Sequence, residues 1–230
     1  MKIMGHRGAR FERPENTLIG IEHALECGVD GIEIDIHAST DRRLMVIHDP
    51  TLERTTNMQG EVSKMTSQEL RKADAGQGQE IPYLEEVMEL VLQKGRVLFI
   101  EAKGIDMEKE LMKLLKDTKY SSQIILKCFH HRWLKEVGSK LPKIKKAALM
   151  NGVPADPKGL AESAGAQMLS LSAQTIDQTC VEMAHAAGIE VCTWNVNEAE
   201  KLNEYLAMGV DWLGTDRPSE IVPALAKTRV

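Results

Sequence analysis

Three acidic side chains stand where apolar strands are expected to end. Glu33 and Asp35 belong to the run GIEIDI, and a spacing of two places both side chains on one face of a strand. Glu101 lies at the end of the later apolar run VLFIEA. Carboxylates that face an apolar interior repel each other and are poorly solvated, and a divalent cation removes that repulsion. Because the donors are all oxygen atoms, Mg²⁺, Ca²⁺ or Mn²⁺ is expected rather than zinc.

Basic residues at neighbouring strand ends allow two interpretations of these acids. Arg7 and Lys103 could form ordinary salt bridges with them, because structural ion-pair networks are common. The presence of all three acids at expected strand ends favours a metal site instead. In that interpretation, Arg7 and Lys103 supply fixed positive charge for a bound phosphoryl group.

His6 and His48 are the candidate proton-transfer groups, because the unperturbed pKa of histidine lies near neutrality and both flank the carboxylates. His37 is a candidate supporting group. His130 and His131 either line the mouth of the site or lie exposed on a loop. His23 and His185 fall in helical stretches and are interpreted as surface or packing residues. Trp194 ends a strand, where it either faces a substrate or packs in the core.

Short apolar runs alternate with amphipathic helical stretches along the chain. Eight runs are expected to be strands: Ile3-Met4, Ile32–Asp35, Leu98–Ala102, Ile124–Cys128, Ala147–Met150, Met168–Leu171, Val191–Trp194 and Trp212–Thr215. Helices are expected within Thr17–Cys27, Leu84–Gln93, Met107–Leu115, Gln174–Ala187 and Glu198–Ala207. This alternation predicts parallel strands with helices outside, and eight units predict a single (β/α)8 TIM barrel of the α/β class over residues 1–230. The competing fold is a doubly wound open sheet.

Two segments depart from the alternation. Leu44 to His48 follows the second strand without an intervening helix, so a hairpin is expected that sets Asp35 opposite Val46. The stretch at about residues 50–82 is a small insertion after the second strand. Thr66 and Glu69 predict a capping box there, and the insertion is expected to cover part of the barrel mouth.

Composition excludes several classes of protein. The formal net charge is −5, without the basic face of a nucleic-acid-binding protein. The four cysteines form no CxxC pair and are interpreted as core thiols in a reducing compartment. The N-terminus lacks an apolar signal segment, and no apolar run reaches the length of a membrane span. A cytoplasmic location without integral membrane association is therefore expected.

A set of ordered motifs resembles a known family. The motifs are HRG at 6–8, PENT at 14–17, EID at 33–35, VIHDPTLERTT at 46–56, IPYLEEV at 81–87, IEAK at 100–103, TWNVN at 193–197 and GTDRP at 214–218. Individually they are weak, but in this order they closely resemble the glycerophosphodiester phosphodiesterase family. The resemblance covers nearly the whole chain and implies a (β/α)8 barrel with an insertion after its second strand.

The resemblance also implies a reaction: hydrolysis of a small-molecule glycerophosphodiester to an alcohol and sn-glycerol 3-phosphate. It implies that His6 and His48 form the acid/base pair and that Arg7 and Lys103 contact the phosphate. It assigns the divalent metal to Glu33, Asp35 and Glu101. Asn16, within PENT, resembles a supporting position, and Trp194 is a second possible supporting residue. The fourth strand reads KCFHH where a Ser-Phe pair is common in the family. Because this strand end lies at the barrel mouth, the resemblance does not determine which alcohol the enzyme releases from its substrate.

Three alternatives are distinguishable by their products or their residues. A lysophospholipase D-like enzyme on the same scaffold predicts an exposed apolar rim at the barrel mouth. A phospholipase C-like enzyme would release cyclic inositol phosphates. A silent phosphate-binding protein would normally have lost a histidine or a metal ligand, and none is missing here.

Overall fold

The predicted barrel is confirmed. The computed structural model describes residues 1–104 and 106–228, and in this part of the chain eight parallel strands close into a ring through the pairing of β1 with β2. They are β1 (Lys2–His6), β2 (Gly31–Ala38), β4 (Val97–Ala102), β5 (Ile124–Cys128), β6 (Lys145–Met150), β7 (Met168–Ser172), β8 (Glu190–Trp194) and β9 (Trp212–Thr215). All eight strands expected from sequence are present, so the open sheet is excluded.

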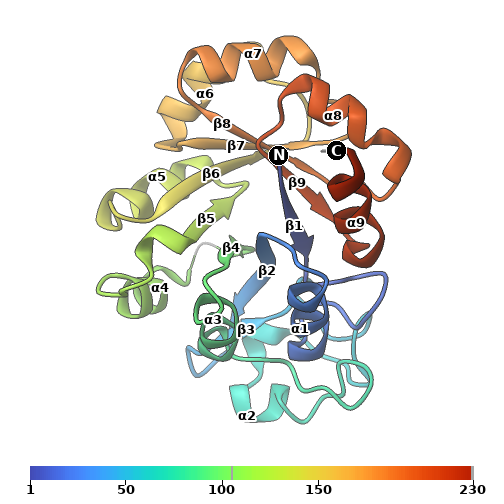
Figure 1. The fold of residues 1–230 in the computed structure, drawn as a ribbon. Coiled ribbons are helices and arrows are strands. Elements are labelled where there is room, and N and C mark those ends of the chain that lie inside the picture. The colour runs from blue at the N-terminus through green and yellow to red at the C-terminus, as the bar shows by residue number, and fades with distance from the viewer. Residues whose placement is uncertain (105, 229–230) are drawn as a thin grey trace.

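Helices surround the strands (Figure 1). They are α1 (Leu18–Glu26), α3 (Leu84–Leu92), α4 (Glu108–Leu115), α5 (His131–Lys140), α6 (Pro157–Ala164), α7 (Gln178–Ala186), α8 (Leu202–Met208) and α9 (Pro218–Thr228). The predicted start of α7 at Gln174 was wrong by about one turn, because Asp177 accepts a hydrogen bond from the Cys180 amide and caps the helix there. Among the described residues, no helix is both long and apolar enough to cross a membrane.

The barrel interior has an apolar floor beneath a polar layer. Met4, Phe99, Ile125 and Trp212 belong to one buried cluster near the N-terminal ends of the strands. The rings of Phe99 and Trp212 meet edge to face with centroids 4.9 Å apart. Alternation along a strand puts the residues two positions further on into the same interior, one layer nearer the C-terminal ends. Two positions after Met4, Phe99 and Ile125 stand the polar residues His6, Glu101 and Lys127.

The expected hairpin exists, with a register one residue away from the predicted one. β3 (Leu44–Val46) pairs antiparallel with β2, and Val46 lies opposite Ile36 rather than Asp35. The connection spans residues 39–43, with Arg42 at φ 63° and the Ser39 amide donating to the Arg43 carbonyl. Since that turn chemistry determines where the strands align, apolar patterning alone misplaced the register.

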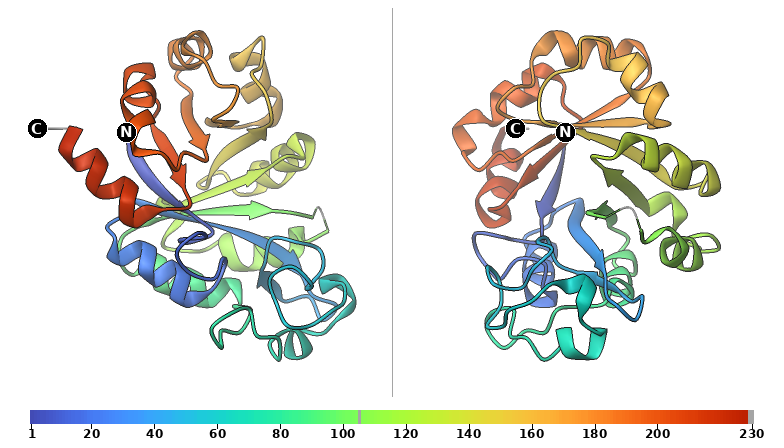
Figure 2. Two further views of the ribbon diagram at one scale, coloured as in Figure 1. Left: turned by 90° about the vertical axis from the view of Figure 1, so that its right-hand side faces the viewer. Right: turned by 180° about the vertical axis from the view of Figure 1, so that it is seen from behind.

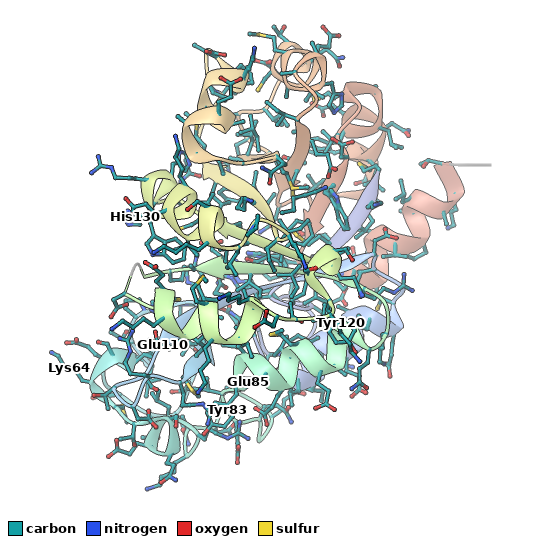
Figure 3. All side chains as sticks on the ribbon, turned by 90° about the vertical axis from the view of Figure 1, so that its left-hand side faces the viewer. Lys64, Tyr83, Glu85, Glu110, Tyr120 and His130 are labelled. Carbon is teal, nitrogen blue, oxygen red and sulfur yellow. The ribbon has the colours of Figure 1, made fainter. Side chains whose placement is uncertain are left out.

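The segment between β3 and α3 forms a small lobe. It contains the 3₁₀ turn η1 (Val62–Lys64) and the short helix α2 (Ser67–Leu70), and the predicted capping box between Thr66 and Glu69 is present. Its side chains form a separate apolar cluster that includes Ile47, Leu52 and Leu70. Figure 2 shows this lobe beside the hairpin end of β2. Figure 3 shows Lys64 of the lobe and His130 on the same side of the molecule, with Tyr120, which precedes β5, on the opposite side.

Candidate active site

Three buried carboxylates converge in the polar layer. Glu33, Asp35 and Glu101 are 0%, 1% and 5% exposed, and ligand atoms from all three lie within 4.8 Å of one another. The strand register explains this, because β2 pairs with β4 so that Asp35 lies directly opposite Glu101. The sequence therefore identified acids that the fold does bring together.

Two lysines and one arginine surround the carboxylates. Lys127 Nζ lies 3.0 Å from Glu33 Oε1 and 3.4 Å from Glu101 Oε2. Lys103 Nζ lies 3.0 Å from Asp35 Oδ1 and also contacts Glu101. Arg7 Nε lies 3.1 Å from Asp35 Oδ2. Three acids and three cations thus form one network, buried except for the half-buried Lys103. The ion pairing that the sequence left as an alternative is therefore part of the geometry.

These ion pairs shift the pKa values of their members. Burial alone would raise the pKa of Asp35, but the charges of Lys103 and Arg7 outweigh burial and hold that pKa well below its usual range. Burial would likewise lower the pKa of Lys127, and the charges of Glu33 and Glu101 raise it instead. The Asp35 carboxylate and the Lys127 ammonium group are therefore both ionised at neutral pH.

The carboxylate cluster also fits a divalent cation. Glu33 Oε1 and Asp35 Oδ1 are buried and make no hydrogen bond of regular geometry, although lysine ammonium groups lie within ion-pair distance of both. Such orphaned acceptors can bind a cation that the lysines only partly replace. Since the donors are all carboxylate oxygens, hard cations such as Mg²⁺, Ca²⁺ and Mn²⁺ suit the cluster.

His6 lies at the C-terminal end of β1, inside the barrel. Its Nδ1 is 2.6 Å from Asp216 Oδ1 and 2.9 Å from Asn195 Nδ2. Its Nε2 is 3.9 Å from Glu33 Oε2. A His6 ring that donates its Nδ1–H to Asp216 presents an unprotonated Nε2 on the side of the carboxylate cluster. In that tautomer the Asn195 amide nitrogen, itself a donor, packs against the ring without a hydrogen bond to Nδ1. Asn197 donates to Asp216 Oδ2 and completes the support from the far end of the chain.

His48 follows the hairpin and is more exposed. Its Nδ1 is 2.5 Å from Asp49 Oδ1, and Arg54 Nε is 2.5 Å from Asp49 Oδ2. The hydrogen bond from Arg54 is the main reason that the pKa of Asp49 is lowered to about 2. His48 is close enough for its charge to lower the pKa of Asp35 as well. Both candidate proton-transfer histidines are therefore oriented by an aspartate on Nδ1.

The β1–α1 connection contributes Arg7 and Asn16, two non-glycine residues with left-handed φ angles of 51° and 56°. The Arg7 amide donates to Glu33 Oε2, and Asn16 Nδ2 donates to Asp35 Oδ2. Gly8, with φ 83°, allows this tight path because a Cβ there would lie 2.7 Å from the Gly20 backbone. Arg7 also pairs with Glu15 at 2.9 Å, so its guanidinium is shared between two acids.

The remaining candidates contact other groups. Trp194 ends β8 with a buried Nε1 that has no hydrogen-bond partner among the described residues, and its ring meets Phe129 edge to face. His37 Nε2 lies 3.0 Å from the His48 carbonyl oxygen. His131 contacts the Leu149 carbonyl, and His130 is exposed on the molecular surface (Figure 3).

Seven residues around the carboxylates and the two histidines were given no role by the sequence: Lys127, Asp216, Glu15, Arg54, Asp49, Asn195 and Asn197. One usable signal was Lys127 itself, a single charge in the apolar run IILKC, and the register places it opposite Glu101. The interpretation of all cysteines as core thiols was wrong for Cys27, which is partly exposed at the end of α1.

Known proteins resemble this chain along its length. The model of the glycerophosphoryl diester phosphodiesterase family matches residues 6–220. Two curated relatives named glycerophosphodiester phosphodiesterase, from Caldanaerobacter subterraneus subsp. tengcongensis and Bacillus altitudinis, are each 33% identical. The first alignment covers 98% of both chains and the second 96% of both.

Solved structures of phosphodiesterases also resemble this chain along its length. A glycerophosphodiester phosphodiesterase from Agrobacterium tumefaciens superposes with a TM-score of 0.86 at 28% identity, over 97% of this chain and 99% of that one. A phosphodiesterase from Oleispira antarctica in complex with the product sn-glycerol-3-phosphate superposes with a TM-score of 0.89 at 26% identity, over 98% of this chain and 97% of that one.

Proposed function

Because the chain belongs to the glycerophosphoryl diester phosphodiesterase family and has its phosphodiesterase activity, we propose that it hydrolyses glycerophosphodiesters to an alcohol and sn-glycerol 3-phosphate. The bound product of the Oleispira antarctica enzyme motivates this choice of product. In this proposal the reaction requires a divalent cation and uses His6 and His48 as its acid/base pair.

The observation that carries the proposal is the cluster of Glu33, Asp35 and Glu101 beside two histidines, each with an aspartate at hydrogen-bond distance from its Nδ1. These three carboxylates would hold the cation. A divalent cation there offsets the carboxylate charge and stabilises negative charge that develops on the phosphate oxygens.

The positive side chains around the cluster bind and orient the phosphodiester. Lys103 is the more accessible of the two lysines, with 17% of its side chain exposed against 4% for Lys127. We assign Lys103 to the phosphate together with Arg7, which is already oriented by Glu15. Lys127 is the more buried lysine and contacts both Glu33 and Glu101, so we assign it to positioning those carboxylates.

The histidines transfer the protons. One imidazole Nε2 removes the proton from the attacking oxygen, which belongs either to water or to the glycerol hydroxyl next to the phosphate. The other imidazole protonates the alkoxide as its bond to phosphorus breaks. Asp216 and Asp49 keep the two rings oriented and stabilise whichever imidazolium forms.

The test is release of sn-glycerol 3-phosphate from glycerophosphocholine, glycerophosphoethanolamine and glycerophosphoglycerol. The protein is treated with EDTA and then supplied with Mg²⁺, Ca²⁺ or Mn²⁺. EDTA should abolish product release and one cation should restore it. Calorimetric titration should show cation binding that Glu101→Gln weakens and Glu85→Gln, at an exposed residue paired with Arg43, leaves unchanged. Full activity in EDTA would refute the metal requirement, and no product with any cation would refute the substrate.

A lysophospholipase D-like activity is the second candidate, favoured by apolar exposure at the mouth. Phe11 follows β1 and Phe129 follows β5, and they are 56% and 45% exposed. Both connections lie at the C-terminal ends of the strands, where an acyl chain would pass. Faster turnover of lysophospholipids than of glycerophosphocholine, reduced by Phe129→Ser, would favour this candidate. No cleavage of lysophospholipids would exclude it.

A further inference from the structure

A second group of metal-ligating side chains lies outside the barrel mouth. Glu12 comes from the β1–α1 connection, and His23 and Cys27 come from the last turn and the C-cap of α1. His23 Nε2 lies 2.7 Å from Glu12 Oε2 and 3.8 Å from Cys27 Sγ. One atom of each residue lies within 4.8 Å of the other two, and all three residues are half-buried.

The three side chains are held in this arrangement by the local structure. A spacing of four on α1 places His23 and Cys27 on one face of the helix. The other carboxylate oxygen of Glu12 accepts hydrogen bonds from the Ser219 amide and hydroxyl, at 3.2 and 2.7 Å. Those bonds orient Glu12 from behind, as outer partners of metal ligands commonly do.

We propose that Glu12, His23 and Cys27 form a binding site for a borderline-soft transition metal ion such as Zn²⁺, distinct from the carboxylate site in the barrel. In tetrahedral zinc coordination a nitrogen and a sulfur ligand lie about 3.5 Å apart, and a nitrogen and an oxygen ligand about 3.3 Å apart. The distance between His23 Nε2 and Cys27 Sγ is near the nitrogen–sulfur value. The distance between His23 Nε2 and Glu12 Oε2 must lengthen by roughly 0.6 Å to reach the nitrogen–oxygen value. A solvent water would take the fourth position.

The donor types separate this site from the catalytic one. A thiolate and an imidazole favour zinc and its neighbours, whereas three carboxylates favour hard cations. Burial, together with the charges of Glu12 and Glu26, raises the pKa of the Cys27 thiol. Metal binding therefore displaces the thiol proton to solvent as the sulfur–metal bond forms, and affinity should rise with pH.

The position of the site suggests what occupancy would do. Glu12 lies in the same connection as Arg7 and Asn16, which contact the catalytic carboxylates. A metal bridging Glu12 to α1 would clamp that connection to the helix.

Cobalt is the probe for the test. Co²⁺ is added to the protein in excess Mg²⁺, so that the carboxylate site is held by the hard cation. We expect a sulfur-to-cobalt charge-transfer absorption that saturates at about one equivalent, since one site holds one ion. Cys27→Ser and His23→Gln should each remove it. His185→Gln is the matched control, because His185 also pairs with a carboxylate, Asp211 at 2.9 Å, while the cysteine of its helix, Cys180, is buried and does not stand four residues from it.

A second measurement uses the unaltered protein. Zn²⁺ should protect Cys27 from alkylation at least tenfold, measured by mass spectrometry of the peptide that contains it, while Mg²⁺ should not. The proposal is overturned if no thiolate absorption appears, if the absorption survives Cys27→Ser or His23→Gln, or if Zn²⁺ leaves the alkylation rate unchanged. None of these outcomes depends on phosphodiesterase activity.

Discussion

The two candidate proton-transfer histidines are supported in opposite ways. His6 is buried, and its partners Asn195 and Asp216 come from strand ends almost the whole chain length away. His48 is partly exposed, and its partner Asp49 is its neighbour in sequence, fastened by Arg54 of the lobe. The inner histidine thus depends on barrel closure, whereas the outer one depends on a local loop. Changes near His6 should therefore affect both activity and stability, and changes near His48 mainly activity.

The largest expected effect is on turnover. His6→Ala and His48→Ala should each lower kcat by roughly 10²–10⁴-fold, because each removes a proton-transfer group. If both act in one reaction sequence, the double variant should lose much less than the product of the two single losses. Steady-state release of glycerol phosphate measures this, with His185→Gln as the control. A loss under about threefold in either single variant would be far below that range and would remove that histidine from the mechanism.

Lys127→Met tests the surroundings of the buried carboxylates through the stability of the protein. The change leaves Glu33 buried without its cation, and removal of one partner of a buried pair costs about 3–5 kcal/mol. Thermal unfolding of the cation-free protein should show this loss, and a saturating divalent cation should restore much of it. Lys64→Met, at an exposed lysine paired with Glu61, is the control and should change stability by less than about 1 kcal/mol. Equal effects at both lysines would contradict the assignment of Lys127.

The aspartates compare the two histidines directly. Asp216→Asn should lower kcat by roughly 10–100-fold, by analogy with the loss of partners that orient metal-bound histidines. Asp49→Asn should lower kcat by less, under about tenfold. Water can reach the more exposed His48 ring and replace part of its interaction with Asp49. Both values come from kcat at saturating substrate. A larger loss at Asp49 than at Asp216 would reverse the inferred order.

The smallest expected effect is the acid dependence of the outer network. Burial alone would raise the pKa of Glu15, but bonds with Arg54 and Arg7 lower it to about 2 from 4.5. Because the pKa of Glu15 is lower in the folded state, its ion pairs contribute their full stabilisation above about pH 4.5, and this stabilisation is lost as pH falls toward 2. Glu15→Gln should therefore lower the free energy of unfolding by about 1–2 kcal/mol at neutral pH. Between about pH 4.5 and pH 2 the variant should show no further loss of stability from this position, because it has no carboxylate there to protonate. Thermal unfolding at several pH values, with Glu85→Gln as control, measures this. An acid dependence identical to that of the unaltered protein would exclude Glu15 as its source.

Short-range pattern predicted most of the fold correctly. The strand and helix positions followed from apolar periodicity, because each element buries one face that its own sequence defines. The errors were at turns. The hairpin register shifted by one residue, and α7 began later than expected, since both depend on individual hydrogen bonds at Arg43 and Asp177. The acids Glu33, Asp35 and Glu101 were found because their charge contradicts the apolar strands that carry them.

What the sequence determined by itself was the set of reactive groups and the strands that carry them. What only the tertiary structure decided was how each group is held. Asp216 and Asn195 reach His6 because the ring closes through β1, and Lys127 lies beside Glu101 because β5 pairs with β4 in one register. These contacts join residues 26 to 210 positions apart. Their partners are chosen by strand pairing around the barrel, which periodicity along a single segment does not encode.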